Sequence, residues 1–229
     1  MGLRNLDNKV LCALLDSKLV LSMSELRSVE AALSHEPENL TLHHLLLKHY
    51  SFAEYNCFHW LFQLKLCLVQ LSKGKWTPVA TRKHRNHLLW FINKAPESQI
   101  FQRAEARVSM ERDPAGVKIV TAQWQKCISE NAGNTTVLKN AVYCLVDSDS
   151  DLCENFVEKG VELEPNDPEW AVLKAEILAW RSKSAKDILL ARLTKAKYQA
   201  QILRRAGSIE AAMKTEAYCT SLQKQLDEF

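Results

Sequence analysis

The sequence predicts an all-α protein built from antiparallel helix pairs. Gly and Pro are scarce, at 6 each among 229 residues, and nearly all of them separate segments whose apolar residues follow helical spacing. A second observation is a repeat, because the turn at residues 131–134 recurs 34 residues later at residues 165–168. At the same offset Leu138 pairs with Val172. A period of this length is typical of stacked helix–turn–helix units.

Apolar stripes predict further helices along the whole chain. The first helix, residues 6–16, has its apolar residues on one face. The second, residues 23–33, begins where a hydroxyl of Ser22 or Ser24 can cap free backbone N–H groups. Pro37 ends the second helix, and Pro96 ends the fourth. The expected helices outside the repeat cover residues 6–16, 23–33, 54–72, 79–95, 186–206 and 208–226.

The composition of successive segments predicts three regions. Residues 1–95 form an N-terminal helical region with a weak version of the repeat. Residues 96–116 lack a clean apolar stripe, which indicates a connecting segment. Residues 117–229 carry the clear repeat and the two closing helices.

Three stretches resemble tetratricopeptide-repeat (TPR) sequences, and the chain is similar to a TPR-containing group of bacterial proteins that mostly lack an assigned function. The stretches are RSVEAALSHEPENLTLHHLLLKHY, RKHRNHLLWFINKAPES and WQKCISENAGNTTVLKNAVYCLVDSDSDLCENFVEKGVELEPNDPEW. The resemblance implies a right-handed solenoid of about 9–11 helices. It further implies a concave groove that holds a peptide or a partner protein, without enzymatic activity. Asn131 departs from the pattern, since a turn Pro is expected there.

In such a solenoid the first helix of each pair lines the groove. Polar residues on those helices are therefore the candidates for binding a partner, and an Asn side chain can bond a peptide backbone through both its carbonyl and its amide. The candidates are Asn134, Lys139, Asn140, Tyr143, Trp170, Lys174 and Glu176. The alternative is that these are ordinary surface residues.

Charge is segregated in the N-terminal half. No Asp or Glu occurs between Glu54 and Glu97, and aromatic residues alternate with basic ones in that interval. A basic strip at residues 65–94 predicts an alternative function, which is binding of nucleic acid or an acidic partner. The competing interpretation is a buried aromatic stripe beside a solvated basic face. The basic candidates are Lys73, Lys75, Arg82, Lys83, Arg85 and Lys94.

The residues form no recognisable catalytic, cofactor or metal site. His84 and His87 share a helix face, but no third ligand stands at a metal-site spacing. A helical enzyme using His43, His84 and His87 ranks third among the functional hypotheses. Gly-rich phosphate loops and nucleophile elbows are missing from the sequence.

The N-terminal residues and the cysteines indicate a cytoplasmic protein. Charged residues interrupt the first 26 residues, which therefore lack the apolar core of a signal peptide. The longest apolar run, residues 57–71, falls short of a membrane span. Seven scattered Cys suit reduced core thiols. Exposed apolar edges at the ends of a solenoid would also support self-association.

Overall fold

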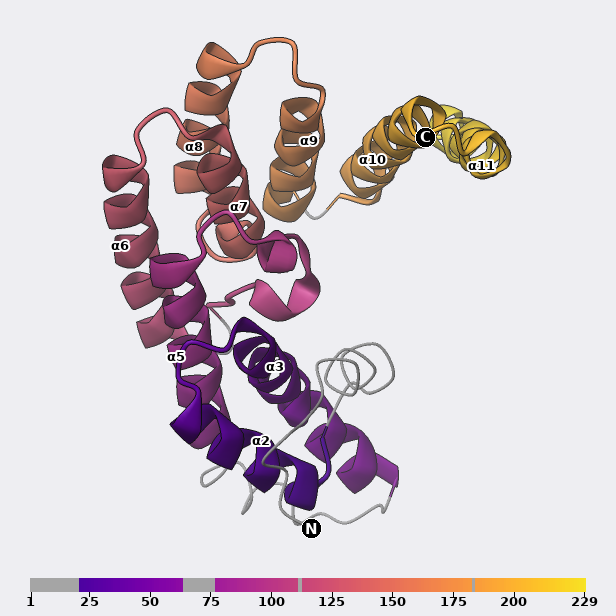
Figure 1. Ribbon diagram of the computed structural model, residues 1–229. Helices are drawn as coiled ribbons and strands as arrows, with labels where there is room; N and C mark the ends of the chain where they lie inside the picture. Colours follow the sequence, from indigo (N-terminus) through magenta and orange to yellow (C-terminus); the bar gives the residue numbers. More distant parts are fainter. Residues whose placement is uncertain (1–20, 64–76, 111–112, 183) are drawn as a thin grey trace. The chain divides into compact units, whose positions relative to one another are not determined.

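The computed structural model describes residues 21–63, 77–110, 113–182 and 184–229, with backbone alone for 52–63 and 77–78. Within these ranges the secondary structure is helical and contains no strand, which confirms the predicted all-α class (Figure 1). The chain divides into two compact units, Met1–Cys127 and Ile128–Phe229. The predicted helix at 6–16, the end of the helix predicted at 54–72, and Lys73 and Lys75 lie outside the described residues.

Unit 1 is organised by α2 (Met23–His35), α3 (Leu40–Gln63) and α5 (Thr77–Lys94). Of the two predicted caps, Ser22 is the residue that begins α2. Its Oγ accepts the Glu25 backbone N–H, and the Glu25 carboxylate accepts the Ser22 backbone N–H at 2.8 Å. This reciprocal pair satisfies two N–H groups that a helix start leaves free. Apolar residues of α2 and α3, among them Val29 and Leu46, then form one core cluster.

Residues 96–116, expected to be a connecting segment, supply core side chains to unit 1. They contain two short 3-10 helices, η1 (Gln99–Gln102) and η2 (Ala104–Ala106). The Phe101 ring is fully buried, with its centroid 4.8 Å from that of Trp124 and 6.4 Å from that of Phe91. The 3-10 turns place these apolar residues inward without the 3.6-residue spacing that a stripe analysis detects.

Helix α6 (Pro114–Glu130) contains the division between the units. Unit 2 then contains α7 (Thr135–Leu145), α8 (Ser150–Leu163) and α9 (Glu169–Ser182). Helix α7 packs against both α8 and α9. Helices α7 and α9 are the elements that the 34-residue offset matches in the sequence. The two matched helices are therefore in contact in the fold.

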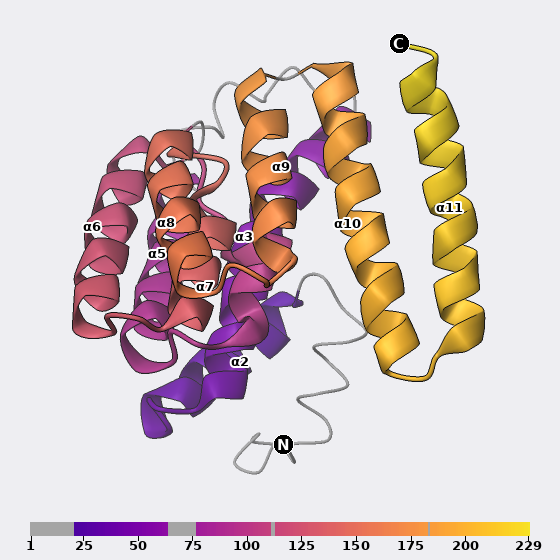
Figure 2. The ribbon, with the colours of Figure 1, turned by 90° about the horizontal axis from the view of Figure 1, so that it is seen from above.

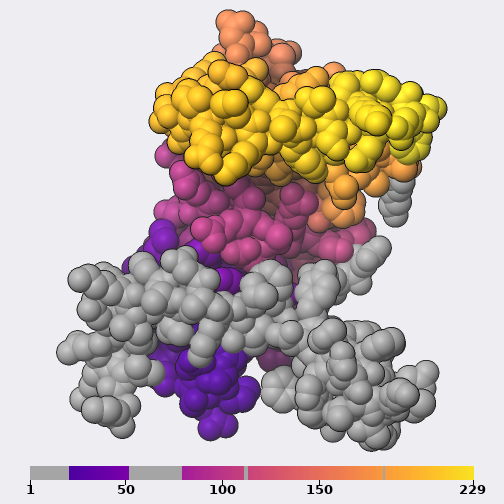
Figure 3. Space-filling view, turned by 90° about the vertical axis from the view of Figure 1, so that its right-hand side faces the viewer, coloured from indigo at the N-terminus to yellow at the C-terminus, as the bar shows by residue number. Residues whose placement is uncertain are grey.

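The last two helices, α10 (Ala185–Arg205) and α11 (Ile209–Asp227), form an antiparallel hairpin. The turn uses Gly207 with φ +76°, a backbone conformation that favours glycine. Helix α10 lies between α9 and α11 (Figure 2), and the hairpin forms one continuous band in space-filling view (Figure 3). Both helices agree with the predicted segments 186–206 and 208–226 to within one residue at each end.

Candidate functional site

Lys139 of α7 lies among three carboxylates at the start of α9. Its Nζ contacts Asp167, lies 3.3 Å from Glu169 Oε2 and 3.6 Å from Glu164 Oε2, and only 13% of its side chain is exposed. Burial favours a lower pKa for Lys139, but the hydrogen bond that Lys139 donates to Asp167 and the charge of Glu169 hold its pKa above the usual value. Lys139 therefore joins α7 to the start of α9 as a charged group.

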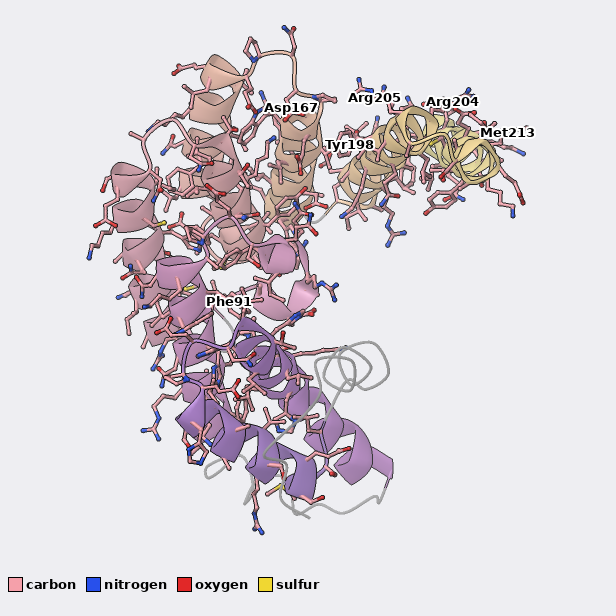
Figure 4. All side chains as sticks on the ribbon, in the orientation of Figure 1. Phe91, Asp167, Tyr198, Arg204, Arg205 and Met213 are labelled. Carbon is pink, nitrogen blue, oxygen red and sulfur yellow. The ribbon has the colours of Figure 1, made fainter. Side chains whose placement is uncertain are left out.

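The same carboxylates organise the surrounding residues. Asp167 Oδ1 accepts the Glu169 backbone N–H at 3.0 Å and so caps the first turn of α9. Tyr143 donates its hydroxyl to Glu169 Oε1 at 2.9 Å, and burial together with that carboxylate raises the pKa of Tyr143. Tyr198 lies on the edge of α10 nearest α9, close to Asp167 (Figure 4). The side chains of Lys139 and Tyr143 thus bond to carboxylates of unit 2 itself.

The other predicted groove residues of the repeat also have structural roles. Asn134 caps α7, since its side chain accepts the Val137 backbone N–H at 3.3 Å. Asn140 is buried. Trp170 is 2% exposed and lies under Lys139, whose Nζ is 5.1 Å from the ring centroid. Glu176 accepts a hydrogen bond from Lys195 at 2.8 Å.

Lys174 differs from these six residues because it is exposed and lines two adjoining hollows between α8 and α9. One hollow, of about 320 Å³, lies beside the Pro165–Pro168 turn, and the other, of about 270 Å³, extends along α8 toward Glu154. Val161 also lines both, so the two hollows form one surface groove. We call this the α8/α9 groove.

The α8/α9 groove has an apolar floor and an acidic wall. Val161 and Leu178 are 41% and 42% exposed, beside the buried Val157 and Ile177. The wall carries Glu154, Glu158 and Glu162 of α8 at four-residue spacing. The sequence analysis did not single out these residues, although the spacing of the three Glu was available as a signal.

Three of the six basic-strip residues pair with carboxylates within unit 1. Lys83 pairs with Glu30 and bonds the Tyr50 hydroxyl at 3.1 Å. Arg85 Nη1 lies 2.9 and 2.8 Å from the two carboxylate oxygens of Asp113. Lys94 pairs with Glu38 at 3.2 Å. The three acidic partners come from segments outside the acid-free interval, so these three basic charges are compensated in the fold.

Among the described residues of the strip, Arg82 is exposed and forms no ion pair with a described carboxylate. Reversing the charge of Arg82 is therefore a clean test of anion binding. The same change at Arg85 would put a carboxylate against Asp113, whose Oδ1 also accepts the Gly116 backbone N–H at the start of α6. A loss of binding after Arg85→Glu would consequently report on folding as well.

Three histidines of unit 1, the buried His43 and the partly buried His84 and His87, bond groups of the same unit. His43 Nδ1 lies 3.0 Å from His87 Nδ1, and His43 stacks on Trp90 with centroids 3.7 Å apart. His84 bonds the Glu105 carbonyl oxygen at 2.7 Å through its Nε2. Among the residues with described side chains, no group of three or more His, Cys, Asp or Glu is arranged to hold a metal ion.

This cluster makes unit 1 sensitive to acid. Burial, together with the charges of His43 and His84, lowers the pKa of His87 to about 3, and burial also lowers the pKa of His43. Below about pH 6.5 these imidazoles bind protons in the unfolded chain but stay neutral in the folded unit. The free energy of unfolding therefore falls as the pH falls toward 3. We expect a slope of up to about 1.4 kcal/mol per pH unit from His87.

Urea unfolding at several pH values measures that slope. A His87→Gln variant should show a shallower dependence between pH 6.5 and 4, whatever its stability at neutral pH. His35 is exposed at the end of α2, so His35→Gln is the control and should keep the full slope. Equal slopes for both variants and the unchanged chain would contradict the assignment.

Within the described ranges, no helix combines the length and the apolar character that crossing a bilayer requires. No family model matches the sequence. No curated protein and no solved structure is significantly similar to it.

Proposed function

We propose that the protein is a non-enzymatic protein-interaction module, built from TPR-like helix pairs stacked as a right-handed solenoid. The 34-residue match between α7 and α9 supports this architecture, because each helix of a repeat stack packs on its own partner and on the matched helix of the next unit. Cys144 and Cys153 are buried and form no disulfide, which fits a reducing, cytoplasmic location.

The observation that carries the proposal is the exposed apolar floor of the α8/α9 groove. Lys139 and Tyr143 of α7 bond carboxylates at the start of α9, and Asn134 caps α7, so these predicted partner-binding side chains are occupied within unit 2. Val161 and Leu178 remain half-exposed and line the groove together with Lys174. A partner that covers these side chains would remove apolar surface from water, which drives association.

Site-specific photo-crosslinking tests this proposal. We expect p-benzoylphenylalanine at position 178 to give a discrete protein adduct in nuclease-treated extract of the source cells. The adduct should disappear when Val161→Glu is added, because a buried charge would oppose docking. Tyr218 of α11 is 51% exposed and outside the groove, so the same cross-linker at position 218 is the control. Indistinguishable adducts from both positions, or adducts insensitive to Val161→Glu, would contradict a specific groove.

A further inference from the structure

Charge is distributed unevenly around the α8/α9 groove. From Asp147 to Glu169 the chain carries nine carboxylates (147, 149, 151, 154, 158, 162, 164, 167 and 169) and one basic residue, Lys159. This contrasts with a net charge of +3 for the whole chain. Residues 147–169 therefore form a strongly acidic part of a protein that is basic overall.

Most of these carboxylates have partners inside the fold. Arg181 bonds Asp151 at 2.6 Å and Glu154 at 2.9 Å, and Asp149 caps α8 by accepting the Leu152 backbone N–H at 3.1 Å. Lys139 holds the three carboxylates that precede and begin α9. These contacts neutralise both ends of the acidic segment.

Glu158 and Glu162 are different. Both are exposed, both line the groove, and no ion pair joins either of them to a described basic side chain. They stand one helical turn apart on the α8 wall, immediately beside the apolar floor formed by Val161 and Leu178. Lys174 occupies the opposite wall on α9.

We propose that the α8/α9 groove binds a basic amphipathic helix of a partner protein, an inference that rests on the proposed function. The apolar face of that helix covers Val161 and Leu178, and Lys or Arg residues at four-residue spacing along one edge meet Glu158 and Glu162. The wall of α8 from Glu154 to Glu162 accommodates about two turns of such a helix. Lys174 on the facing wall favours an acidic or neutral opposite edge, which fixes the direction of the bound helix.

The occupant follows from charge complementarity. A nucleic acid would bring its phosphates against two carboxylates, and an acidic helix would do the same. A purely apolar segment would remove water from the carboxylates of Glu158 and Glu162 without offering them an opposite charge, which costs free energy. Basic side chains on a helix edge avoid both the repulsion between like charges and the uncompensated desolvation of the carboxylates. Helices with apolar anchors at i, i+3 and i+4 are a recurrent ligand of helical grooves.

Binding of defined peptides to the full chain tests the inference. One probe is a fluorescein-labelled 16-residue helix with a Leu face and Lys along one edge, and the second has Glu in place of every Lys. At about 50 mM salt we expect the Lys peptide to bind at least tenfold more tightly than the Glu peptide, measured by fluorescence anisotropy, with the difference shrinking at higher salt.

Variants then separate the contribution of the charged wall to peptide binding from that of the apolar floor. Glu158→Gln/Glu162→Gln should weaken binding of the Lys peptide about fivefold or more. The control Glu210→Gln/Glu228→Gln removes two exposed charges from the α11 segment and should change binding less than twofold. Val161→Ser/Leu178→Ser should weaken binding of the Lys peptide at least tenfold, because it removes the apolar contact.

The outcomes distinguish the two levels of the proposal. Equal binding of both peptides, or loss in the Ser variant without any effect of the Gln variant, would overturn the basic partner and leave the groove as an interaction site. Equal weakening by the Gln variant and its control would overturn the role of Glu158 and Glu162. Absence of binding by either peptide, together with no adduct at position 178, would overturn the proposed function itself.

Discussion

Replacing Trp170 by alanine should destabilise unit 2 by about 3–5 kcal/mol, the range for removing a buried Trp or Phe side chain. The indole is 2% exposed between α8 and the charged end of Lys139. Its loss leaves a cavity and also removes the surface on which the Lys139 ammonium lies. Urea unfolding followed by circular dichroism measures the change, because helix content does not depend on the fluorescence of the deleted residue.

Gly160 supplies an internal control for that prediction. A Cβ built on Gly160 would lie 2.3 Å from two ring carbons of Trp170, far inside contact distance. Gly160→Ala alone should therefore cost about 1–3 kcal/mol. Combined with Trp170→Ala, the same change should be neutral or should stabilise by up to about 1 kcal/mol, since alanine is the better helix former. Additive effects would show that the two residues do not meet.

Removing the charge of Lys139 should have an effect of similar size. Lys139→Met keeps most of the side-chain volume but leaves Asp167, Glu169 and Glu164 facing one another without a cation. Breaking a mostly buried ion pair from one side costs about 3–5 kcal/mol, and we expect about 2–4 here because Glu164 is partly exposed. Thermal and urea unfolding of the variant measure this cost.

The pH dependence of that cost identifies its cause. Burial opposes the charge of Asp167, but the hydrogen bond from Lys139 lowers the pKa of Asp167 below its ordinary value of 3.8. The stabilisation is therefore present above that pH and is lost as the pH falls through the lower, folded-state value. The penalty of Lys139→Met should shrink below about pH 4. Lys214→Met, which removes an exposed pair with Glu210, should cost less than about 1 kcal/mol.

The helical class and the positions of most turns could be predicted from the sequence. Helical spacing of apolar residues, caps such as Asn134, and breakers such as Gly207 are local properties, and each acts within a few residues along the chain. The hairpin helices α10 and α11 matched the prediction for this reason. The segment around Phe101 did not, because 3-10 turns bury side chains without that spacing.

The candidate site depended on distances that sequence spacing does not encode. Lys139, Tyr143 and Asn134 occupy helix positions that would suit a partner, yet two of them meet carboxylates of the following repeat and the third caps its own helix. In unit 1, Arg85 and Asp113 are 28 residues apart in the chain, and Arg85 Nη1 contacts both carboxylate oxygens of Asp113 in the fold. Part of the basic strip in the sequence thus forms internal ion pairs.

The sequence by itself determined that this chain is helical, where its 34-residue sequence repeat lies and where many of its helices begin and end, because the 3.6-residue period and the capping groups act locally. Only the tertiary structure decided which charges pair within the fold and which stay exposed. Glu154 and Glu158 lie one helical turn apart on α8, but the packing of α9 brings Arg181 to Glu154 and leaves Glu158 exposed at the groove. That difference arises from the contact between helices, which no single helix specifies.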